Sequence, residues 1–578
     1  MEQAVQHLDR RRFMSLLAGL GLAGTTLPDI LWAQAGSDDP LTDADVAAAA
    51  RLAGLELTAE ERELMITSLD QLRENYRALR RVAVDNSVPP ALLFDPTITG
   101  DPAPRDLPKR FQKDRGAPSL PDDPAEIAFL PAAELGRLIR ARQISSMELT
   151  ELYLERLVRL DPQLECVITL TDERAFDQAR KADVELDRGR VRSPLHGIPW
   201  GAKDLLAVRG YPTTWGAEPF RDQVIDQDAT VVTKLDEAGA VLVAKLSLGA
   251  LAWGDVWFDG TTRNPWNLEQ GSSGSSAGPG AATSAGLVGF AIGSETWGSI
   301  VSPSTRCGVT GLRPTFGAVS RHGAMALSWS MDKLGSMGRS VEDCALVFDV
   351  IRGADGLDPT AVDRPFPWDP AIDARGLRVG YLQSLFEAIP EDEEDPDRAR
   401  EIHELDLESL EVLRSIGVKP VAVELPDLPV SALSFILSAE AAAAFDELTR
   451  SGLDDELVRQ IEEAWPNEFR VARTIPAVEY IQANRVRTLV MNEMARIFEE
   501  LDVYVSPTFG GDNLLLTNLT GHPAVVVPNG FPSDGSPSSL TFTGGLHREA
   551  EVLAVAKAFQ DATGHHLRRP PIGSKVKS

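Results

Sequence analysis

Apolar residues recur along this chain in two patterns, which predict helices alternating with buried strands. Ser145 and Glu148 stand in capping-box spacing before a helix that we expect to run to about Leu160, and Thr171–Arg188 has a helical period. Short β-rich runs lie farther along and are interpreted as strands: Val241–Ala244, Val288–Ile292, Leu377–Leu382, Pro420–Glu424, Val503–Val505, Ala524–Val527 and Leu540–Phe542. Because such alternation is typical of helices layered on a largely buried sheet, the pattern predicts an α/β domain.

Residues 40–95 carry helical patterns without candidate chemistry. One helix starts at Thr42, and Thr58 with Glu61 forms a second capping box. Apolar side chains then fall on one face of the second helix: Met65, Leu69, Leu72, Tyr76 and Leu79. We expect a small helical hairpin that caps the domain after it. A linker rich in proline and charge follows at 96–124, before a catalytic domain at 125–571.

Composition and charge exclude several functions. The 578 residues carry a net charge of −29, and an acidic surface repels phosphate backbones, so we expect no nucleic-acid partner. The three cysteines, Cys166, Cys307 and Cys344, have no CxxC spacing, and the eight histidines are dispersed. We therefore predict neither a metal site nor a cofactor.

The N-terminus has the pattern of an export signal. Arg10–Arg12 precede Phe13, an apolar stretch runs from Leu16 to Leu27, and Ala33–Ala35 offers small residues for cleavage. This resembles a twin-arginine signal over residues 1–35, with an apolar segment short for a membrane span. We expect a periplasmic or secreted protein without a stable membrane span after cleavage. The alternative is an uncleaved N-terminal anchor.

The segment Gly271–Pro303 is the richest in candidate chemistry. Two serine clusters flank the apolar run Leu287–Ile292, which a flexible Ser/Gly linker would have no reason to contain. We predict a loop, a short Ala-rich helix, a buried strand and a second loop, with a serine presented on each loop. Upstream, Lys203 ends a short apolar segment beside Asp204. This arrangement is typical of an active site built from hydroxyls and main-chain amides.

Together these segments resemble the amidase signature family. Further stretches fit the same family in the same order: AGAVLVAK (238–245), TRNPWN (262–267), CGVTGLRPTFGAVSRHG (307–323), SMDKLGSMGRSVED (330–343), DVYVSPT (502–508) and NLTGHPAVVVPNGF (518–531). The resemblance covers roughly 125–571 and implies a mixed, twisted central sheet covered by helices. The N-terminal helices are similar to the C subunit of tRNA-dependent amidotransferases.

The resemblance implies a Ser–Ser–Lys triad of Ser299, Ser275 and Lys203. Ser299 would be the nucleophile, and Ser275, after a cis peptide bond to Gly274, would relay its proton to Lys203. A serine hydroxyl needs a base, and lysine serves only when burial lowers its pKa from about 10.4. The implied reaction is hydrolysis of a carboxamide, with esters as an open extension, through an acyl-enzyme. The expected partner is a small-molecule amide substrate.

Main-chain N–H groups from Thr296 to Ser299 are the candidates for binding the oxyanion, with Thr296, Gly298 and Ser276 as the oxyanion or substrate-binding set. The GSSAG segment also matches the G-x-S-x-G nucleophile elbow, with Ser276 at its centre. An elbow needs a strand directly before it, and we expect none in NPWNLEQGSS. Ser276 is therefore predicted to support the site through hydrogen bonds.

Several positions depart from the family pattern near the nucleophile. Trp297 stands where the loop normally carries glycine, and such a side chain disfavours a positive φ. Val301 replaces the usual arginine and Glu295 the usual aspartate, so we expect an ion pair of the family to be lost. The acid usually found near Ala250 is also missing. We interpret these changes as altered specificity.

Two other functions stay open. One is a non-catalytic binding protein on an amidase scaffold, which the departures allow. The other is a component similar to the tRNA-dependent amidotransferases, which the N-terminal helices suggest and the export signal and acidic charge oppose. The sequence leaves the substrate and the oligomeric state open, a homo-oligomer included.

Overall fold

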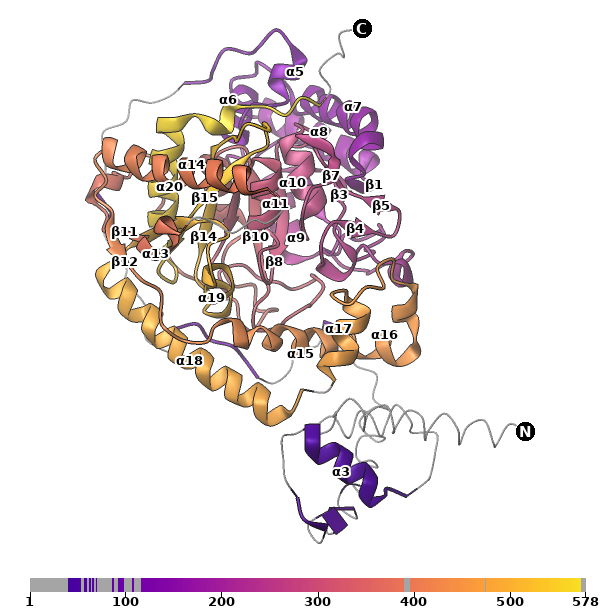
Figure 1. The fold of residues 1–578 in the computed structure, drawn as a ribbon. Helices are drawn as coiled ribbons and strands as arrows, with labels where there is room; N and C mark the ends of the chain where they lie inside the picture. The colour runs from indigo at the N-terminus through magenta and orange to yellow at the C-terminus, as the bar shows by residue number, and fades with distance from the viewer. Residues whose placement is uncertain are drawn as a thin grey trace. The chain divides into compact units, whose positions relative to one another are not determined.

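The structure is a computed structural model that describes residues 40–52, scattered residues between 57 and 108, and residues 116–388, 395–473 and 475–572 (Figure 1). The predicted export signal at 1–35 lies outside the described residues. The chain divides into two compact units. One comprises the described residues of Met1–Pro89 with Ala432–Thr488, and the other those of Pro90–Ser431 with Leu489–Ser578.

The larger unit is built on a mixed sheet of eleven described strands, in the order β1-β3-β2-β8-β10-β9-β14-β15-β13-β11-β12 (Figure 1). Their bounds are β1 Val167–Leu170, β2 Pro199–Lys203, β3 Val241–Leu246, β8 Phe290–Glu295, β9 Thr310–Arg313, β10 Lys333–Gly338, β11 Val379–Leu382, β12 Val421–Val423, β13 Val503–Pro507, β14 Ala524–Gly530 and β15 Ser538–Gly544. β2 runs parallel to both β3 and β8, whereas β8 and β10 are antiparallel. The α/β fold class with a mixed central sheet is confirmed.

All seven predicted strands occur, with small differences in their ends. The strand expected at Val288 begins at Phe290, because Leu287 and Val288 lie in the buried turn between helix and strand. Four strands of the sheet escaped the sequence pattern, namely β1, β2, β9 and β10. β2 reads PWGAK and β10 reads KLGSMG, so glycine and lysine interrupt the apolar run that would have revealed them.

Helices pack against this sheet. α7 and α8 contact β3, α12 contacts β9 and β10, and α20 contacts β14 and β15. The main helices of this unit are α6 Ala132–Arg140, α7 Ser146–Leu164, α8 Asp172–Asp187, α9 Thr230–Ala238, α10 Ala277–Ser284, α11 Val301–Cys307, α12 Val341–Ile351, α13 Gln383–Glu387, α14 Pro396–Ser415, α19 Asn513–Leu519 and α20 Glu549–Thr563. The capping box of α7 is confirmed: Glu148 N donates to Ser145 Oγ at 3.1 Å, and Ser145 N donates to Glu148 Oε2 at 2.8 Å.

One apolar core lies where α7, α8 and α10 meet β3 and β8. Its members are all buried: Leu157 and Leu160 from α7, Ala179 from α8, Val241 and Val243 from β3, Ala281 and Ala282 from α10, and Ala291 from β8. Small alanines on α10 let this short helix approach the sheet closely. The packing holds the loop before α10 near the carboxyl end of β8, where Ser276 bonds Ser294, while the loop after α10 meets the start of β2 through Gly289 N and Pro199 O.

The smaller unit is helical in its described residues. α3 (Asp43–Leu52) packs Leu41 and Ala49 against Ile66 and Leu69, and Arg62 pairs with Asp43 at 2.7 Å. Much of the second predicted helix, Leu72 to Leu79 included, lies outside the described residues. The other part contains α15 Phe435–Ala444, α16 Asp446–Ser451 and α17 Trp465–Ala472, while α18 Ala477–Glu500 crosses the boundary between the units.

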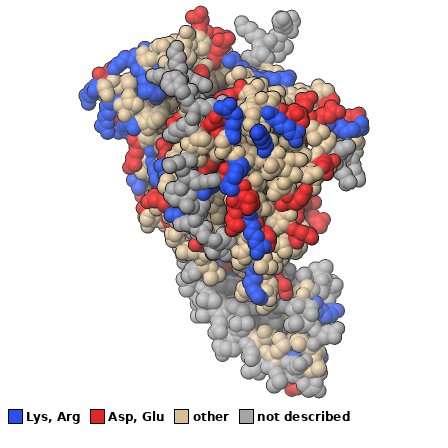
Figure 2. Space-filling view, turned by 90° about the vertical axis from the view of Figure 1, so that its left-hand side faces the viewer, with Lys and Arg blue, Asp and Glu red and all other residues tan. Residues whose placement is uncertain are grey.

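The described part of the chain shows no membrane-spanning helix, since none of its helices is both long and apolar enough. On the face drawn in Figure 2, acidic and basic side chains are interspersed. The coloured residues of that face form no single acidic patch.

Candidate active site

The carboxyl ends of two neighbouring parallel strands bring the predicted residues together. Ala202 of β2 is in register with Ile292 of β8, so Lys203 and the loop that follows Glu295 lie at the same edge of the sheet. The amino end of α10, which follows Ser276, joins them there: Ser276 N donates to the carbonyl of Ser299 at 3.0 Å. The sheet edge thus collects all three predicted triad residues.

Lys203 is fully buried and surrounded by hydroxyls. Its Nζ lies 2.8 Å from Ser275 Oγ, 3.1 Å from Ser276 Oγ and 2.9 Å from Ser294 Oγ. Burial lowers the pKa of Lys203 well below its ordinary value, and the charges of Asp332 and Glu295 oppose this shift only in part. This is the environment in which a lysine can lose its proton and act as a base.

Ser276 ties the helix to the strand. Its Oγ donates to Ser294 O at 3.1 Å and accepts from Ser294 N at 3.1 Å, besides its contact with Lys203. These bonds occupy a buried hydroxyl, which suits the supporting role that we predicted.

Our reason for rejecting a nucleophile elbow at Ser276 was nevertheless wrong. Asn267–Gly271 does form a strand, β7, which pairs with β6 (Arg263–Asn264) in a separate two-stranded ribbon. β7 is largely exposed, so its side chains had no apolar pattern by which the sequence could reveal it.

The peptide bond between Gly274 and Ser275 is cis, as the resemblance implied. A Cβ at position 274 would lie 1.8 Å from the carbonyl oxygen of Gly254, so only glycine fits beside that main chain.

The loop from Thr296 to Ser299 carries the N–H groups that we predicted to bind the oxyanion. Its positive φ, +89°, falls on Gly298 and not on Trp297, so the large side chain causes no strain of the kind we expected there. Ser299 is 9% exposed, whereas the Trp297 side chain is 45% exposed. Within the described residues, the main-chain N–H groups of Trp297, Gly298 and Ser299 donate no hydrogen bond. They are therefore available to a ligand.

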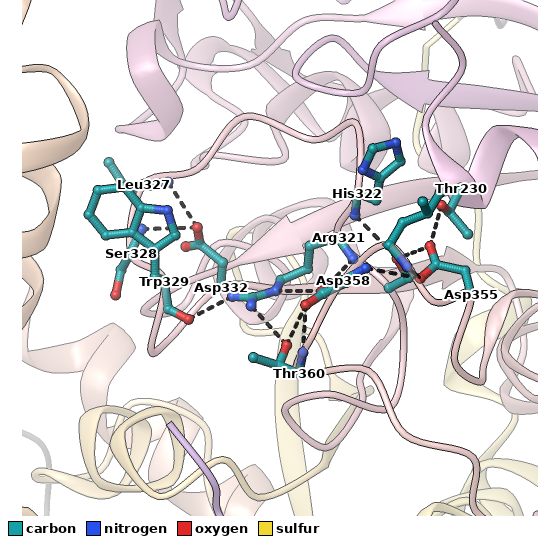
Figure 3. Close-up of polar contacts among 12 residues, drawn as sticks. Thr230, Arg321, His322, Leu327, Ser328, Trp329, Asp332, Asp355, Asp358 and Thr360 are labelled. Carbon is teal, nitrogen blue, oxygen red and sulfur yellow. Dashed lines mark hydrogen bonds and ion pairs between the residues drawn. The ribbon is translucent and has the colours of Figure 1, made fainter. Parts of the chain in front are cut away.

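Asp332 anchors the start of this loop. Thr296 Oγ1 donates to Asp332 Oδ1 at 2.6 Å. Asp332 Oδ2 accepts from the main-chain N–H groups of Leu327 and Ser328 (Figure 3). Burial raises the pKa of Asp332, and the hydrogen bond from Thr296 and the charge of Arg321 oppose that rise. Sequence reasoning missed Asp332, although the SMDKLGSMG segment that contains it carried part of the resemblance.

A second carboxylate network supports the same region from farther away. Arg321 donates to Trp329 O at 2.8 Å and pairs with Asp358 at 3.1 Å, which holds the 327–332 turn in place (Figure 3). Next to it, Asp355 accepts from Thr230 Oγ1 at 2.5 Å. These contacts join the segment between β9 and β10 and the start of α9 to the chain after α12.

Glu295 holds the end of the loop. Its Oε2 accepts from Ile300 N at 2.8 Å and Val301 N at 2.9 Å, and its Oε1 lies 2.8 Å from both Arg313 Nη1 and Asn518 Nδ2. Burial alone would raise the pKa of Glu295, but Arg313 and these hydrogen bonds lower it to about 2. Val301 carries no charge and so cannot pair with Glu295, as we expected, but Glu295 is not left unpaired because it takes Arg313 of β9 as its partner.

Lys245 is a second buried lysine, on the strand next to Lys203. It pairs with Asp204 at 2.6 Å, and both side chains are fully buried. Asp204 also accepts from Thr214 N at 2.8 Å, and Lys245 donates to Thr213 Oγ1 at 2.7 Å. Burial lowers the pKa of Lys245, and the neighbouring carboxylate of Asp204 opposes this shift in part.

Comparison with known proteins agrees with this fold and shows the family. The family model described as Amidase matches residues 148–516, and the chain belongs to this family. It is 34% identical to the A subunit of the glutamyl-tRNA(Gln) amidotransferase of Moorella thermoacetica, over 78% of this chain and 99% of that protein.

Solved structures show the same likeness. The native peptide amidase of Stenotrophomonas maltophilia has a TM-score of 0.65 and 30% identity, over 76% of this chain and 98% of that one. A vestigial protein complex described as revealing the origins of an s-triazine catabolic enzyme has a TM-score of 0.67 and 27% identity, over 75% of this chain and 99% of that one. The chain is thus of the class that acts on carbon–nitrogen bonds, as hydrolases or amidotransferases.

Proposed function

We propose that this protein hydrolyses carboxamide bonds through an acyl-enzyme on Ser299, with Ser275 and Lys203 as its proton relay. The observation that carries the proposal is the burial of Lys203 among three hydroxyls, with no directly paired carboxylate among the residues that the structure describes. A lysine in that environment favours the neutral amine, which is the form that a general base requires.

The hydrogen bonds around Lys203 give the relay a direction. The Ser276 hydroxyl donates to Ser294 O, so towards Lys203 it can only accept. A neutral lysine would donate its two N–H groups to Ser276 and Ser294 and turn its lone pair to the Ser275 hydroxyl. Ser275 can then pass its proton to Lys203 while it receives the proton of Ser299.

The reaction follows from this relay. Ser299 Oγ attacks the amide carbonyl, and its proton moves through Ser275 to Lys203. The tetrahedral oxyanion accepts from the N–H groups of the Thr296–Ser299 loop, where the loss of one donor typically costs about 3–4 kcal/mol of barrier. The same proton returns to the departing amine as the carbon–nitrogen bond breaks. A water molecule then gives its proton through Ser275 to Lys203 and attacks the acyl-enzyme, and the proton returns to Ser299 as the acid leaves.

The test is the intact mass of the protein after exposure to small fluorophosphonate and sulfonyl fluoride reagents. We expect one adduct on Ser299 that disappears in Ser299→Ala and Lys203→Ala. Ser302→Ala, which removes a neighbouring hydroxyl, is the matched control and should label normally. An unlabelled wild-type protein would favour the non-catalytic binding protein. An adduct that survives in Lys203→Ala would contradict the relay.

A second candidate is an amidotransferase-like component, favoured by the match to 99% of the Moorella amidotransferase chain. The net charge of −29 opposes it, because a tRNA partner would be repelled. A gel-shift titration with tRNA at low salt separates the two candidates. No shift, together with amide hydrolysis by the chain alone, supports the hydrolase, whereas tRNA binding and glutamine-dependent amidation support the amidotransferase.

We also propose that the protein is exported, on the basis of Arg10–Arg12 and the apolar stretch after them. The small-molecule substrate would then be met outside the cytoplasm. Replacing the three arginines by lysine should leave the protein in the cytoplasm at its full mass, as judged by cell fractionation and mass spectrometry. Export of that variant at the wild-type level would contradict a twin-arginine route.

A further inference from the structure

The loop that presents Ser299 is closed by the side chain of the residue just before it. Glu295 ends β8, and its carboxylate bonds Ile300 N at 2.8 Å and Val301 N at 2.9 Å, at the far end of the same turn. Thr296, Trp297, Gly298 and Ser299 therefore form a ring of chain, with the carboxylate as its clasp. A short loop tied in this way has few conformations left.

The clasp is itself held by groups from two other elements. Arg313 of β9 and Asn518 of α19 both reach Glu295 Oε1 at 2.8 Å, and Arg313 also donates to His522 O at 3.0 Å. The carboxylate thus has four donors around it and is fully buried. A glutamate with this set of partners stays ionised and in one orientation.

The main-chain N–H groups of the loop fall into two sets. Those of Ile300 and Val301 donate to Glu295, whereas those of Trp297, Gly298 and Ser299 have no acceptor among the described residues and can donate to a substrate. Leu514, on the same helix as Asn518, stands 3.1 Å from the position of a Cβ on Gly298 and supports the turn from outside.

We propose that Glu295 is a positioning residue, whose clasp on Ile300 and Val301 fixes Ser299 and the oxyanion-binding N–H groups for the reaction. The effect on the reaction rests on the proposed function, whereas the closure of the loop does not. The family resemblance implies an aspartate at 295 and an arginine at 301, whereas here Glu295 pairs with Arg313. In this chain the carboxylate that supports the nucleophile loop is held by residues of another strand and another helix, Arg313 of β9 and Asn518 of α19.

Three variants test the clasp. Glu295→Gln keeps the side-chain volume but places an amide N–H₂ among groups that are themselves hydrogen-bond donors. Glu295→Asp is one methylene shorter and should not reach the N–H groups of Ile300 and Val301. The double variant Glu295→Asp/Val301→Arg introduces the aspartate–arginine pair that the family resemblance implies at these two positions. Glu549→Gln is the matched control, because Glu549 is a buried carboxylate that accepts from a main-chain N–H, of Thr315, outside the loop.

The first measurement is the rate of fluorophosphonate labelling of Ser299. We expect Glu295→Gln and Glu295→Asp to label about 100-fold more slowly, because a small displacement of a reacting group costs that much. The double variant should recover at least about 10-fold, and the control should stay near the wild-type rate. Wild-type rates in both single variants would overturn the proposal, and so would an equal loss in the control.

The second measurement is hydrogen exchange of the Ile300 and Val301 amides by mass spectrometry, which needs no activity. Both amides should exchange faster in Glu295→Gln and Glu295→Asp, while peptides from β14 and β15 keep their protection. That comparison separates local opening from a general loss of folding. Protected amides in both variants would overturn the clasp. If the wild-type protein is not labelled but the Ile300 and Val301 amides lose protection in the variants, the proposed hydrolase is refuted and the closure of the loop by Glu295 still holds.

Discussion

Two lysines on adjacent strands, both fully buried, have opposite surroundings. Lys245 of β3 faces the carboxylate of Asp204 at 2.6 Å, whereas the described hydrogen-bond partners of Lys203 of β2 are all serine hydroxyls. Burial lowers the pKa of both side chains, and it lowers that of Lys203 well below the ordinary value because no carboxylate pairs with it directly. Residue type and burial are the same, so the partner decides between a structural cation and a base.

The contrast explains why the two lysines cannot exchange roles. An ion pair buried with good geometry keeps its charge, and it is costly to break because the remaining ion has no partner. Hydroxyls stabilise an ammonium less than a carboxylate does, and they also accept or donate when the amine is neutral. The protein thus places Lys245, whose charge is fixed by its ion pair, on the strand next to Lys203, which can gain and lose a proton.

Removing the base should have the largest effect. Lys203→Arg keeps a cation that cannot become neutral, so we expect kcat/KM for amide hydrolysis to fall by about 10³–10⁴-fold. Steady-state kinetics with a small amide, or the labelling rate of Ser299, measures this loss. A variant that keeps more than a tenth of the activity would show that Lys203 is not the base.

Breaking the structural pair should affect stability more than chemistry. Lys245→Met leaves Asp204 buried and unpaired, which should lower the free energy of unfolding of this unit by about 3–5 kcal/mol. Urea unfolding followed by fluorescence measures the change. In Lys245→Met/Asp204→Asn both charges are absent, so most of the loss should return. A double variant as unstable as the single one would contradict the ion-pair explanation.

Trp297 should control which amides enter the site. Its side chain is 45% exposed and stands two residues before Ser299, so we expect it to narrow the acyl pocket or to stack on a flat substrate. Trp297→Gly should change the ratio of kcat/KM between aromatic and small acyl amides by about 10-fold. An active variant with an unchanged substrate range would refute this role.

The smallest effect concerns pH. The rate should rise with pH as Lys203 loses its proton and then level off. Asp332 and Glu295 carry the charges that raise the pKa of Lys203 against burial. Asp332→Asn removes one negative charge, which disfavours the ammonium, so the rising limb of kcat/KM should move to lower pH. Asp358→Asn, farther along the network, is the control. If the rising limb of kcat/KM stays at the same pH in Asp332→Asn, the charge of Asp332 does not affect the pKa of Lys203.

Local patterns in the sequence predicted much of the fold. The capping box of α7, the seven apolar strands and the loop–helix–strand–loop order of Gly271–Pro303 all depend on neighbours within a few residues. β2 escaped prediction although it carries Lys203, because a strand of five residues with glycine and lysine has no apolar period. The cis bond before Ser275 followed from the resemblance and not from any pattern in the residues.

By itself, the sequence determined the family, the layered α/β fold and the residues that could form a Ser–Ser–Lys site. Only the tertiary structure decided what surrounds them: hydroxyls for Lys203, a carboxylate for Lys245, and Arg313 for Glu295. Asn518, which shares Glu295 with Arg313, lies 223 residues away along the chain. The pKa of a buried group depends on neighbours within a few ångströms, and those neighbours come from distant strands and helices at no fixed spacing in sequence.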